Sequence, residues 1–245
     1  GRVITKFETV FPRLARVDHD TPLAGRTIER VVSEGKHLIM YFSGDLHLRT
    51  HMRMHGTWHI YKPGERWRMR FSDMRIVIET DAWVAVAFNV PVAEFNDAVV
   101  IGPDLLGETF DFDEAMKNIR ARPAEEIADV LLNQRVVAGI GNEYKSEVLF
   151  VARINPFTRV ADLTNEQLLH ILETARKLMI ANVTKRGAGR VTTFSLDPGQ
   201  QQYVFGRGGQ PCRRCGTPVR YAKQGKDARG TYWCERCQRA ATMRA

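Results

Sequence analysis

The chain has 245 residues, of which 44% are hydrophobic and 26% are charged, so it suits one or two globular domains and is not mainly disordered or fibrous. It contains no run of roughly 20 apolar residues that could span a membrane and no signal-peptide pattern, so we expect a cytoplasmic protein without a membrane partner. The net charge of +8 lies entirely in residues 203–245, which favours a polyanionic partner over a solvated basic tail.

Short segments with alternating apolar residues fill the first hundred positions. Turn-forming residues separate them at 43–45 and 63–64. Short strands at this spacing predict a β-sandwich or a barrel. The expected strands cover residues 3–10, 27–32, 37–42, 57–61, 75–80 and 83–88.

Between residues 110 and 182 the apolar residues recur every three or four positions, which predicts helices. One helix would contain Pro123 in its first turn and end at Gly139. A second would follow Gly141, with Asn142 as its N-cap. This middle section is therefore expected to be helical.

A capping box of Thr164 and Gln167 predicts the start of a third helix. Residues 101–104 resemble a linker between the strand-rich and helical sections. Residues 185–202 are rich in Gly, Thr and Gln and predict a mobile loop that leads into the basic C-terminal module.

All four cysteines form two Cys-x-x-Cys pairs, Cys212 with Cys215 and Cys234 with Cys237, separated by 18 residues. This spacing is typical of a tetrahedral zinc site, and four thiolates leave the metal no open position, so the predicted Zn²⁺ is structural. The alternative, a pair of redox motifs, lacks the βαβ context that such motifs need.

The segments 219–221 and 231–233 lie between the cysteine pairs and would pair as a β-hairpin. Residues 203–245 contain eight Arg and two Lys against one Asp and one Glu, so this hairpin would be strongly basic. The side chains expected to face a phosphate backbone or a groove are Arg220, Lys223, Lys226 and Arg229.

Two further motifs are ambiguous when taken alone. The run Gly139-Ile140-Gly141-Asn142 could cradle a phosphate at a helix start, although such glycines often serve only as capping residues. Lys36 precedes an apolar strand and could be a plain exposed charge. In the turn 51–56 Met52 suits the core, whereas Met54 could act as a wedge in a base stack.

Taken together, these features resemble the formamidopyrimidine-DNA glycosylase and endonuclease VIII family of base-excision repair enzymes. Several separate motifs occur in the family's order over nearly the whole chain. They are GKHL at 35–38, HMRMHG at 51–56, GPDLL at 102–106, LNQRVVAGIGNEY at 132–144, and YVFGR at 203–207, followed by the four cysteines and Gln238.

The resemblance implies a multidomain α+β fold in three parts. These are an N-terminal β-sandwich at 1–102, a helical domain with a helix–two-turn–helix motif at 103–202, and a zinc-finger β-hairpin at 203–245. It implies one structural Zn²⁺ and a monomer that binds double-stranded DNA with a damaged base or abasic site in the cleft between the domains. The compartment would be the bacterial cytosol or nucleoid.

The resemblance also implies roles for particular residues. Asn142 and Arg229 match residues that grip the phosphates beside a flipped nucleotide. Lys36 matches a lysine that contacts phosphate and assists catalysis, and His51 matches a further phosphate contact. The side chains that match the loop filling the vacated space in the duplex are Arg53, Met54 and His55.

The family's nucleophile is an N-terminal proline, followed by a glutamate and an opening helix, and this sequence begins at Gly1 in the first strand. We expect that it starts after that segment, so the first helix and the catalytic amine are missing from it. The amine of Gly1 is out of register with that proline. Lys36 could supply a weak lyase amine if burial and nearby cations lowered its pKa.

The first hypothesis is a DNA glycosylase and AP lyase of the endonuclease VIII branch, which removes oxidised pyrimidines through a Schiff base followed by β/δ-elimination. Residues 54–58 and 232–234 and a short connector before the zinc hairpin favour this branch. Oxidised purines such as 8-oxoguanine are the alternative substrates. A third hypothesis is a non-catalytic module that binds damaged DNA.

Overall fold

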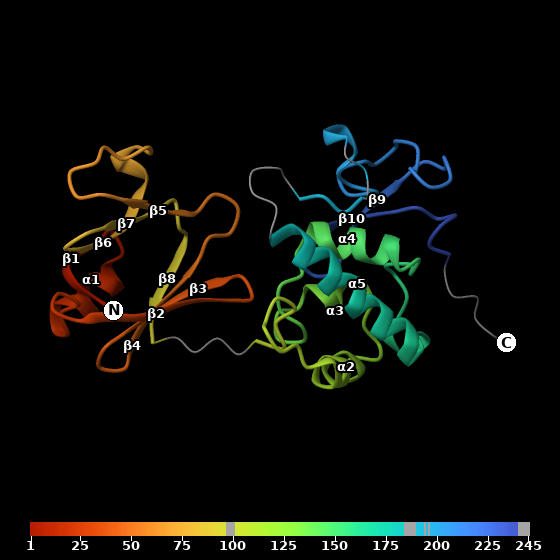
Figure 1. Ribbon diagram of the computed structural model, residues 1–245. Helices are drawn as coiled ribbons and strands as arrows, with labels where there is room; N and C mark the ends of the chain where they lie inside the picture. Colours follow the sequence, from red (N-terminus) through yellow and green to blue (C-terminus); the bar gives the residue numbers. More distant parts are fainter. Residues whose placement is uncertain (97–100, 184–189, 194, 196, 240–245) are drawn as a thin grey trace. The chain divides into compact units, whose positions relative to one another are not determined.

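The structure is a computed structural model that describes residues 1–96, 101–183, 190–193, 195 and 197–239. Contacts divide the chain into two compact units, Gly1–Val99 and Val100–Ala245. The first consists mainly of strands, and the second combines helices with a two-stranded hairpin (Figure 1). Within the described residues, no helix is both long and apolar enough to cross a bilayer.

The first unit is built on an antiparallel sheet in the order β5-β7-β6-β1-β2-β3-β4-β8. Helix α1 (Pro12–Asp20) connects β1 to β2, and the short turn η1 (Phe71–Asp73) precedes β6. The strands are β1 (Arg2–Thr9), β2 (Thr27–Glu34), β3 (His37–Phe42), β4 (Leu46–His51), β5 (Thr57–Tyr61), β6 (Met74–Thr80), β7 (Val84–Phe88) and β8 (Val92–Phe95).

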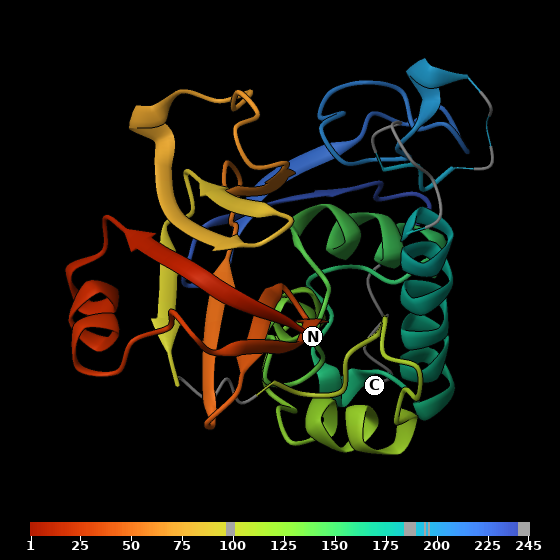
Figure 2. The ribbon, with the colours of Figure 1, turned by 60° about the vertical axis from the view of Figure 1, so that its left-hand side comes forward.

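This sheet folds over on itself at β1. The start of β1 pairs with β2, whereas Ile4 and the residues after it pair with β6. Inward side chains of the two halves share one core, in which Met40 and Leu48 pack with Ile76 and Ile78. Two layers that bury a common core form a sandwich, so the predicted N-terminal β-sandwich is confirmed (Figure 2).

The six predicted strands all form, but three elements of this unit were missed. Helix α1 was missed because its polar residues surround a single fully buried position, Leu14. Strand β4 alternates buried Leu46 and Leu48 with polar residues, a pattern obscured by the histidine-rich turn that follows it. Strand β8 has no fully buried residue.

The second unit places its most buried helix at the centre. Helix α4 (Asn142–Val151) lies between α3 and α5 on one side and strand β10 on the other, and seven of its residues are buried (Figure 1). The remaining elements are α2 (Phe112–Arg120), α3 (Ile127–Leu132), η2 (Val160–Asp162), α5 (Asn165–Val183), η3 (Pro198–Gln200), β9 (Arg220–Gln224) and β10 (Arg229–Trp233).

Three details of the helix prediction are wrong. Pro123 lies in a turn before α3, where its carbonyl accepts a hydrogen bond from the backbone N–H of Ala161, and Gly139 lies beyond the helix in the second turn before α4. Asn142 is the first residue of α4, and its N-cap is Gly141. The capping box before α5 is confirmed, because Thr164 and Gln167 each accept from the other's backbone N–H.

Residues 101–104 are not a linker. The backbone N–H of Gly102 donates to Gln134 O, and Pro103 O accepts from the N–H of Ala138. A Cβ atom on Gly102 would lie 2.4 Å from Val136 O, so this close approach requires glycine. The segment therefore packs against the two turns that connect α3 to α4 and fixes their path.

Candidate nucleic-acid interface

The four cysteines form a closed metal site. Their sulfur atoms lie within 4.8 Å of one another, with 3.9 Å between Cys212 Sγ and Cys237 Sγ and 3.5 Å between Cys215 Sγ and Cys234 Sγ. A tetrahedron with Zn–S bonds of about 2.3 Å has sulfur atoms about 3.8 Å apart, which these distances fit. The predicted ligand set for one structural zinc is confirmed.

Gln238 attaches this zinc site to the end of α4. Its Oε1 accepts from the backbone N–H of Cys234 at 2.9 Å, and its Nε2 donates to Ile154 O at 2.9 Å. Asn155 Nδ2 donates to the carbonyl of Gln238. Because Gln238 is fully buried, these contacts fix the metal-bound turn to the helical core.

The predicted hairpin between the cysteine pairs is confirmed. Strands β9 and β10 pair in register, with Tyr221 opposite Tyr232. At the tip, Gly225 has φ 69°, and a Cβ atom there would lie 2.4 Å from Asp129 Oδ1 on α3. The hairpin tip therefore packs closely against the helices. Its predicted cationic side chains, Arg220, Lys223, Lys226 and Arg229, are all exposed.

A buried polar chain connects α4 to the hairpin. Lys145 is fully buried, and its Nζ donates to Thr231 Oγ1 at 2.7 Å and to Gly230 O at 3.2 Å. Thr231 Oγ1 donates to Gln224 Oε1, and Gln224 Nε2 donates to Glu126 Oε2, each at 2.7 Å. Burial lowers the pKa of Lys145 to about 8, with Asp129 opposing the shift and Arg229 adding to it.

This chain brings Asn142 and Arg229 to one end of the second unit. Asn142 precedes Lys145 by three residues on α4, so both lie on neighbouring positions of one helix face. Arg229 adjoins Gly230, whose carbonyl accepts from Lys145, and its charge acts on the Lys145 pKa. The Arg229 side chain is 60% exposed, and its Nε lies 3.9 Å from Asp227 Oδ2.

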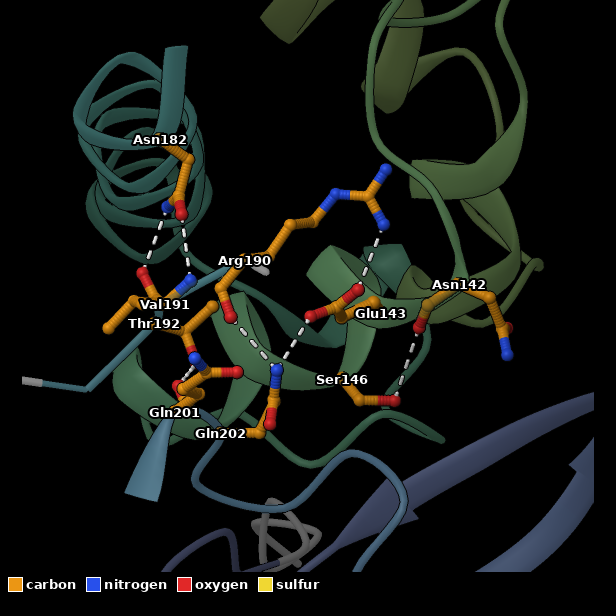
Figure 3. Close-up of polar contacts among 9 residues, drawn as sticks. All are labelled: Asn142, Glu143, Ser146, Asn182, Arg190, Val191, Thr192, Gln201 and Gln202. Atoms are coloured by element: carbon orange, nitrogen blue, oxygen red, sulfur yellow. Dashed lines mark hydrogen bonds and ion pairs between the residues drawn. The ribbon is translucent and has the colours of Figure 1, made fainter. Parts of the chain in front are cut away.

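The Asn142 side chain takes no part in the internal hydrogen bonds of the described residues. Its Oδ1 is buried without a partner there, and the amide points away from the bonded cluster on the other side of α4 (Figure 3). The N–H groups in the first turn of a helix have no acceptor within the helix. This end of α4 can therefore offer an amide and backbone donors to an anion.

Glu147 anchors the segment that enters the zinc hairpin. It is fully buried and accepts from the backbone N–H groups of Tyr203, Val204 and Phe205, each at 2.8 Å, and from Thr192 Oγ1. Burial raises the pKa of Glu147, against the opposing effect of these hydrogen bonds. One carboxylate thus fixes residues that are far apart in the sequence.

The predicted loop 185–202 is described only in part, because residues 184–189, 194 and 196 lie outside the described residues. Arg190 Nη1 forms an ion pair with Glu143 Oε2 at 2.9 Å, and Gln202 Nε2 donates to Glu143 Oε1 at 3.2 Å (Figure 3). Its described residues are thus held against α4. A cavity of about 430 Å³ opens here, and its wall includes Glu143, Gln202, Phe205, Arg207 and Arg213.

The first unit brings its predicted phosphate contacts together where β3 begins and β4 ends. Lys36 lies in the turn between β2 and β3, and the neighbouring His37 pairs across the sheet with His51 at the end of β4, with ring centroids 4.9 Å apart. Burial lowers the pKa of His51, and the charges of Lys36, Arg53 and Arg49 lower it further. Lys36 and His51 thus belong to one cationic cluster.

The turn after β4 exposes its predicted wedge. Arg53 has φ 49°, and the N–H of Gly56 donates to Met52 O at 2.9 Å, which closes a tight turn. Met54 at its tip is 88% exposed, the highest value among the large hydrophobic residues described. Met52 instead packs against the sandwich core, as predicted. The turn therefore presents an apolar side chain between Arg53 and His55.

Lys145 and Glu147 were not among the predicted site residues. The helical period places charged residues of an amphipathic helix on its solvent side, but α4 is covered on that side by the hairpin. The available signal was weak, because α4 (NEYKSEVLFV) mixes Lys145 and Glu147 with further polar residues before its apolar end.

Three family models match the chain in order. The formamidopyrimidine-DNA glycosylase N-terminal domain matches residues 1–91, the formamidopyrimidine-DNA glycosylase H2TH domain matches 101–195, and the zinc finger found in FPG and IleRS matches 209–240. These matches follow the sandwich, the helices with their two turns, and the four-cysteine hairpin.

Named relatives cover most of the chain. A probable endonuclease 8 2 from Streptomyces coelicolor is 40% identical over 97% of this chain and 87% of its own length. The DNA-(apurinic or apyrimidinic site) lyase Nei2 of Mycolicibacterium smegmatis is 34% identical over 98% and 92%. A formamidopyrimidine-DNA glycosylase from Corynebacterium jeikeium is 30% identical over 98% and 93%.

Solved structures of the same group of proteins also align with nearly the whole chain. The complex between Lactococcus lactis Fpg and an abasic-site-containing DNA aligns with a TM-score of 0.75 at 26% identity, covering 98% of this chain and 93% of that one. The fold, the zinc ligands and the extent of these similarities agree, and the chain therefore belongs to the family of formamidopyrimidine-DNA glycosylases and endonuclease 8 proteins.

Proposed function

We propose that this chain is a base-excision repair DNA glycosylase with AP lyase activity, acting on double-stranded DNA with a damaged base or an abasic site. The observation that carries this proposal is the polar chain through Lys145. It joins α4, whose first residue is Asn142, to Gly230 and Thr231, which follow the exposed Arg229 in the zinc hairpin. Two donors on separate elements, kept at one surface, suit neighbouring phosphates of one strand.

Each predicted residue has a physical task in this proposal. Asn142 and Arg229 would hold the phosphates beside the flipped nucleotide, and Lys36 and His51 would contact further phosphates. Charge-assisted hydrogen bonds of this kind offset an unstacking cost of a few kcal/mol. Arg53, Met54 and His55 would fill the space that the base leaves, with Met54 as the apolar wedge.

The chemistry requires an amine at the sugar. The amine attacks C1′, the damaged base leaves with the bonding electrons and takes up a proton, and the resulting Schiff base permits β- and then δ-elimination of the phosphates. The family resemblance assigns this amine to an N-terminal proline, which no residue of this sequence matches. Among the residues of this chain, Lys36 is the candidate for a weaker lyase amine, because it matches the family's lysine that assists catalysis.

We propose oxidised pyrimidines as the substrate class. Identity to relatives named endonuclease 8 or Nei2 reaches 40% and 34%, against 30% for a relative named formamidopyrimidine-DNA glycosylase. Oxidised purines are the second candidate, because an aligned solved structure is titled as MutM in complex with carbocyclic 8-oxo-G containing DNA.

The finer organisation is proposed on the same basis. We propose domain boundaries at 1–102, 103–202 and 203–245, a monomer, and the cytoplasm as the site of action. The monomer follows because one chain carries phosphate donors, a wedge and a zinc hairpin, so a single duplex needs no second copy.

Borohydride trapping tests the enzymatic proposal. The chain is incubated with a duplex that contains 5-hydroxyuracil or an abasic site, and the reduced product is measured by intact mass. A covalent adduct is expected, and peptide mapping then identifies the amine, with Lys36→Gln as the variant that tests that residue. Tight and lesion-specific binding without any adduct would instead support a damaged-DNA-binding module.

A further inference from the structure

The loop between β5 and β6 carries a basic and aromatic sequence that the proposed function does not use. Residues 65–71 are ERWRMRF, so arginines alternate with apolar residues. Trp67 and Met69 are partly buried against the core, while the side chains at 66, 68 and 70 are exposed. In Figure 1 the loop rises beyond the strands β5 and β7.

Three aromatic rings form a row that is anchored in the core. Tyr61 is 1% exposed, and Trp67 stacks on it with ring centroids 6.5 Å apart. Phe71 stacks on Trp67 at 5.7 Å, with an angle of 7° between the ring planes. The edge of Phe88 supports Trp67 from the side. Phe71 ends the row and is 69% exposed, so a further flat ring could continue the stack.

The charge around this open end is positive. In the described part of the chain, none of the ion pairs involves Arg66, Arg68 or Arg70. The loop holds two carboxylates, Glu65 and Asp73, and Glu65 accepts from the backbone N–H of Lys62. An open hollow of about 580 Å³ is lined by residues 65–71. The surface thus combines an exposed aromatic face with three exposed arginines that form no ion pair in the described residues, one of which, Arg68, lies over the Tyr61 ring at 6.0 Å.

We propose that this loop binds an unpaired nucleotide of single-stranded DNA, with the base stacked on Phe71 and the adjoining phosphates contacted by the arginines. Aromatic platforms beside cationic side chains are the general means of binding single strands, because every base has a face that can stack. An apolar protein segment would leave three arginines desolvated, and a duplex has its base faces covered. This contact needs no lesion and is separate from the proposed glycosylase site.

Fluorescence anisotropy with an unmodified, labelled ten-nucleotide oligothymidylate tests the proposal on the full chain. We expect Phe71→Ala to weaken binding about tenfold, equivalent to about 1.4 kcal/mol. Phe71→Tyr keeps the ring and should bind within about twofold of the parent chain. Arg66→Gln should make the dependence of log Kd on log salt shallower by about 0.7, the value for one phosphate of a single strand.

Arg16→Gln is the matched control, because Arg16 is an exposed arginine of the same unit on α1, outside the loop. Equal binding by the parent chain, Phe71→Ala and Arg66→Gln would overturn the proposal, and so would a loss of affinity in Arg16→Gln as large as in Arg66→Gln. Binding of Arg229→Ala to an abasic-site duplex, measured in parallel, tests the proposed repair function independently. If only that binding weakens, the loop proposal fails and the repair function stands.

Discussion

At the scale of single residues, the environment of each predicted side chain decides what it can contribute. Burial lowers the pKa of His51, and three neighbouring cationic groups lower it further, which favours the neutral ring in the unbound protein. The apolar side chain of Met54 is almost wholly exposed, so it does not stabilise the fold by burial. Such a side chain suits a contact that forms only with a binding partner. Neither the pKa shift of His51 nor the exposure of Met54 could be predicted from the residue type alone.

The pKa of His51 predicts a pH dependence of DNA binding. A phosphate contact would raise the pKa of His51 in the complex above its value in the unbound chain. At a pH between these two pKa values, His51 would be protonated more often in the complex than in the unbound chain. Affinity for an abasic-site duplex should therefore rise as pH falls from 7.5 to 6, by up to about tenfold for each unit by which the phosphate raises the pKa.

This dependence should be smaller in His51→Gln and unchanged in the control His19→Gln, which removes an exposed histidine of α1. Anisotropy titrations at several pH values measure it. An identical pH profile for His51→Gln and the parent chain would show that His51 does not contact phosphate.

At the scale of elements, α4 organises the second unit because it is buried on all sides. Lys145 joins it to the hairpin, Glu147 joins it to the segment that enters the hairpin, and Gln238 joins its end to the zinc turn. Two charged groups that are fully buried are tolerated because each meets several hydrogen-bond partners.

Glu147→Gln should therefore destabilise the protein. An amide would turn an N–H group toward backbone donors that now point at a carboxylate oxygen, so buried donors would lose their acceptor. We expect the free energy of unfolding to fall by about 3 kcal/mol, measured by urea titration.

Glu143→Gln is the matched control on the same helix. It removes an ion pair whose arginine is 60% exposed, so its effect should stay below about 1 kcal/mol. Equal losses in the two variants would contradict the anchoring role of Glu147.

The element pattern was predictable where local physics decides it. Alternation located six strands of the sandwich, and cysteine spacing with the two flanking segments located the zinc hairpin. The N-cap of α4 was misplaced by one residue, because Gly141 can adopt the capping conformation without a side-chain hydrogen bond. The segment 101–104 was misread as a linker, because its partners lie more than thirty residues away in the sequence.

At the scale of the whole molecule, each of the two units carries its own group of candidate residues. The second unit unites Asn142, Arg229 and the cysteines, and the first unites Lys36, His51 and the exposed turn. Motif order over nearly the whole chain identified the family, whereas the polar chain through Lys145 depends on contacts between α4 and β10 that no local pattern encodes.

Loss of the metal should disable the second unit's part of the interface. Cys234→Ser removes one of four ligands, so zinc should be lost and, with it, the specific binding of abasic-site DNA. Atomic emission measures the metal, and anisotropy measures the binding. Arg236→Gln in the same turn, which is exposed and no ligand, should keep its zinc. Unchanged metal content in Cys234→Ser would refute the closed site.

The central claim is that Asn142 and Arg229 hold the same DNA strand, and a double-mutant cycle on an abasic-site duplex tests it most directly. Arg229→Ala should weaken binding and make the salt dependence of log Kd shallower by about 0.9, and Asn142→Ala should cost less in the Arg229→Ala background than alone. Strictly additive losses together with an unchanged salt slope would contradict it.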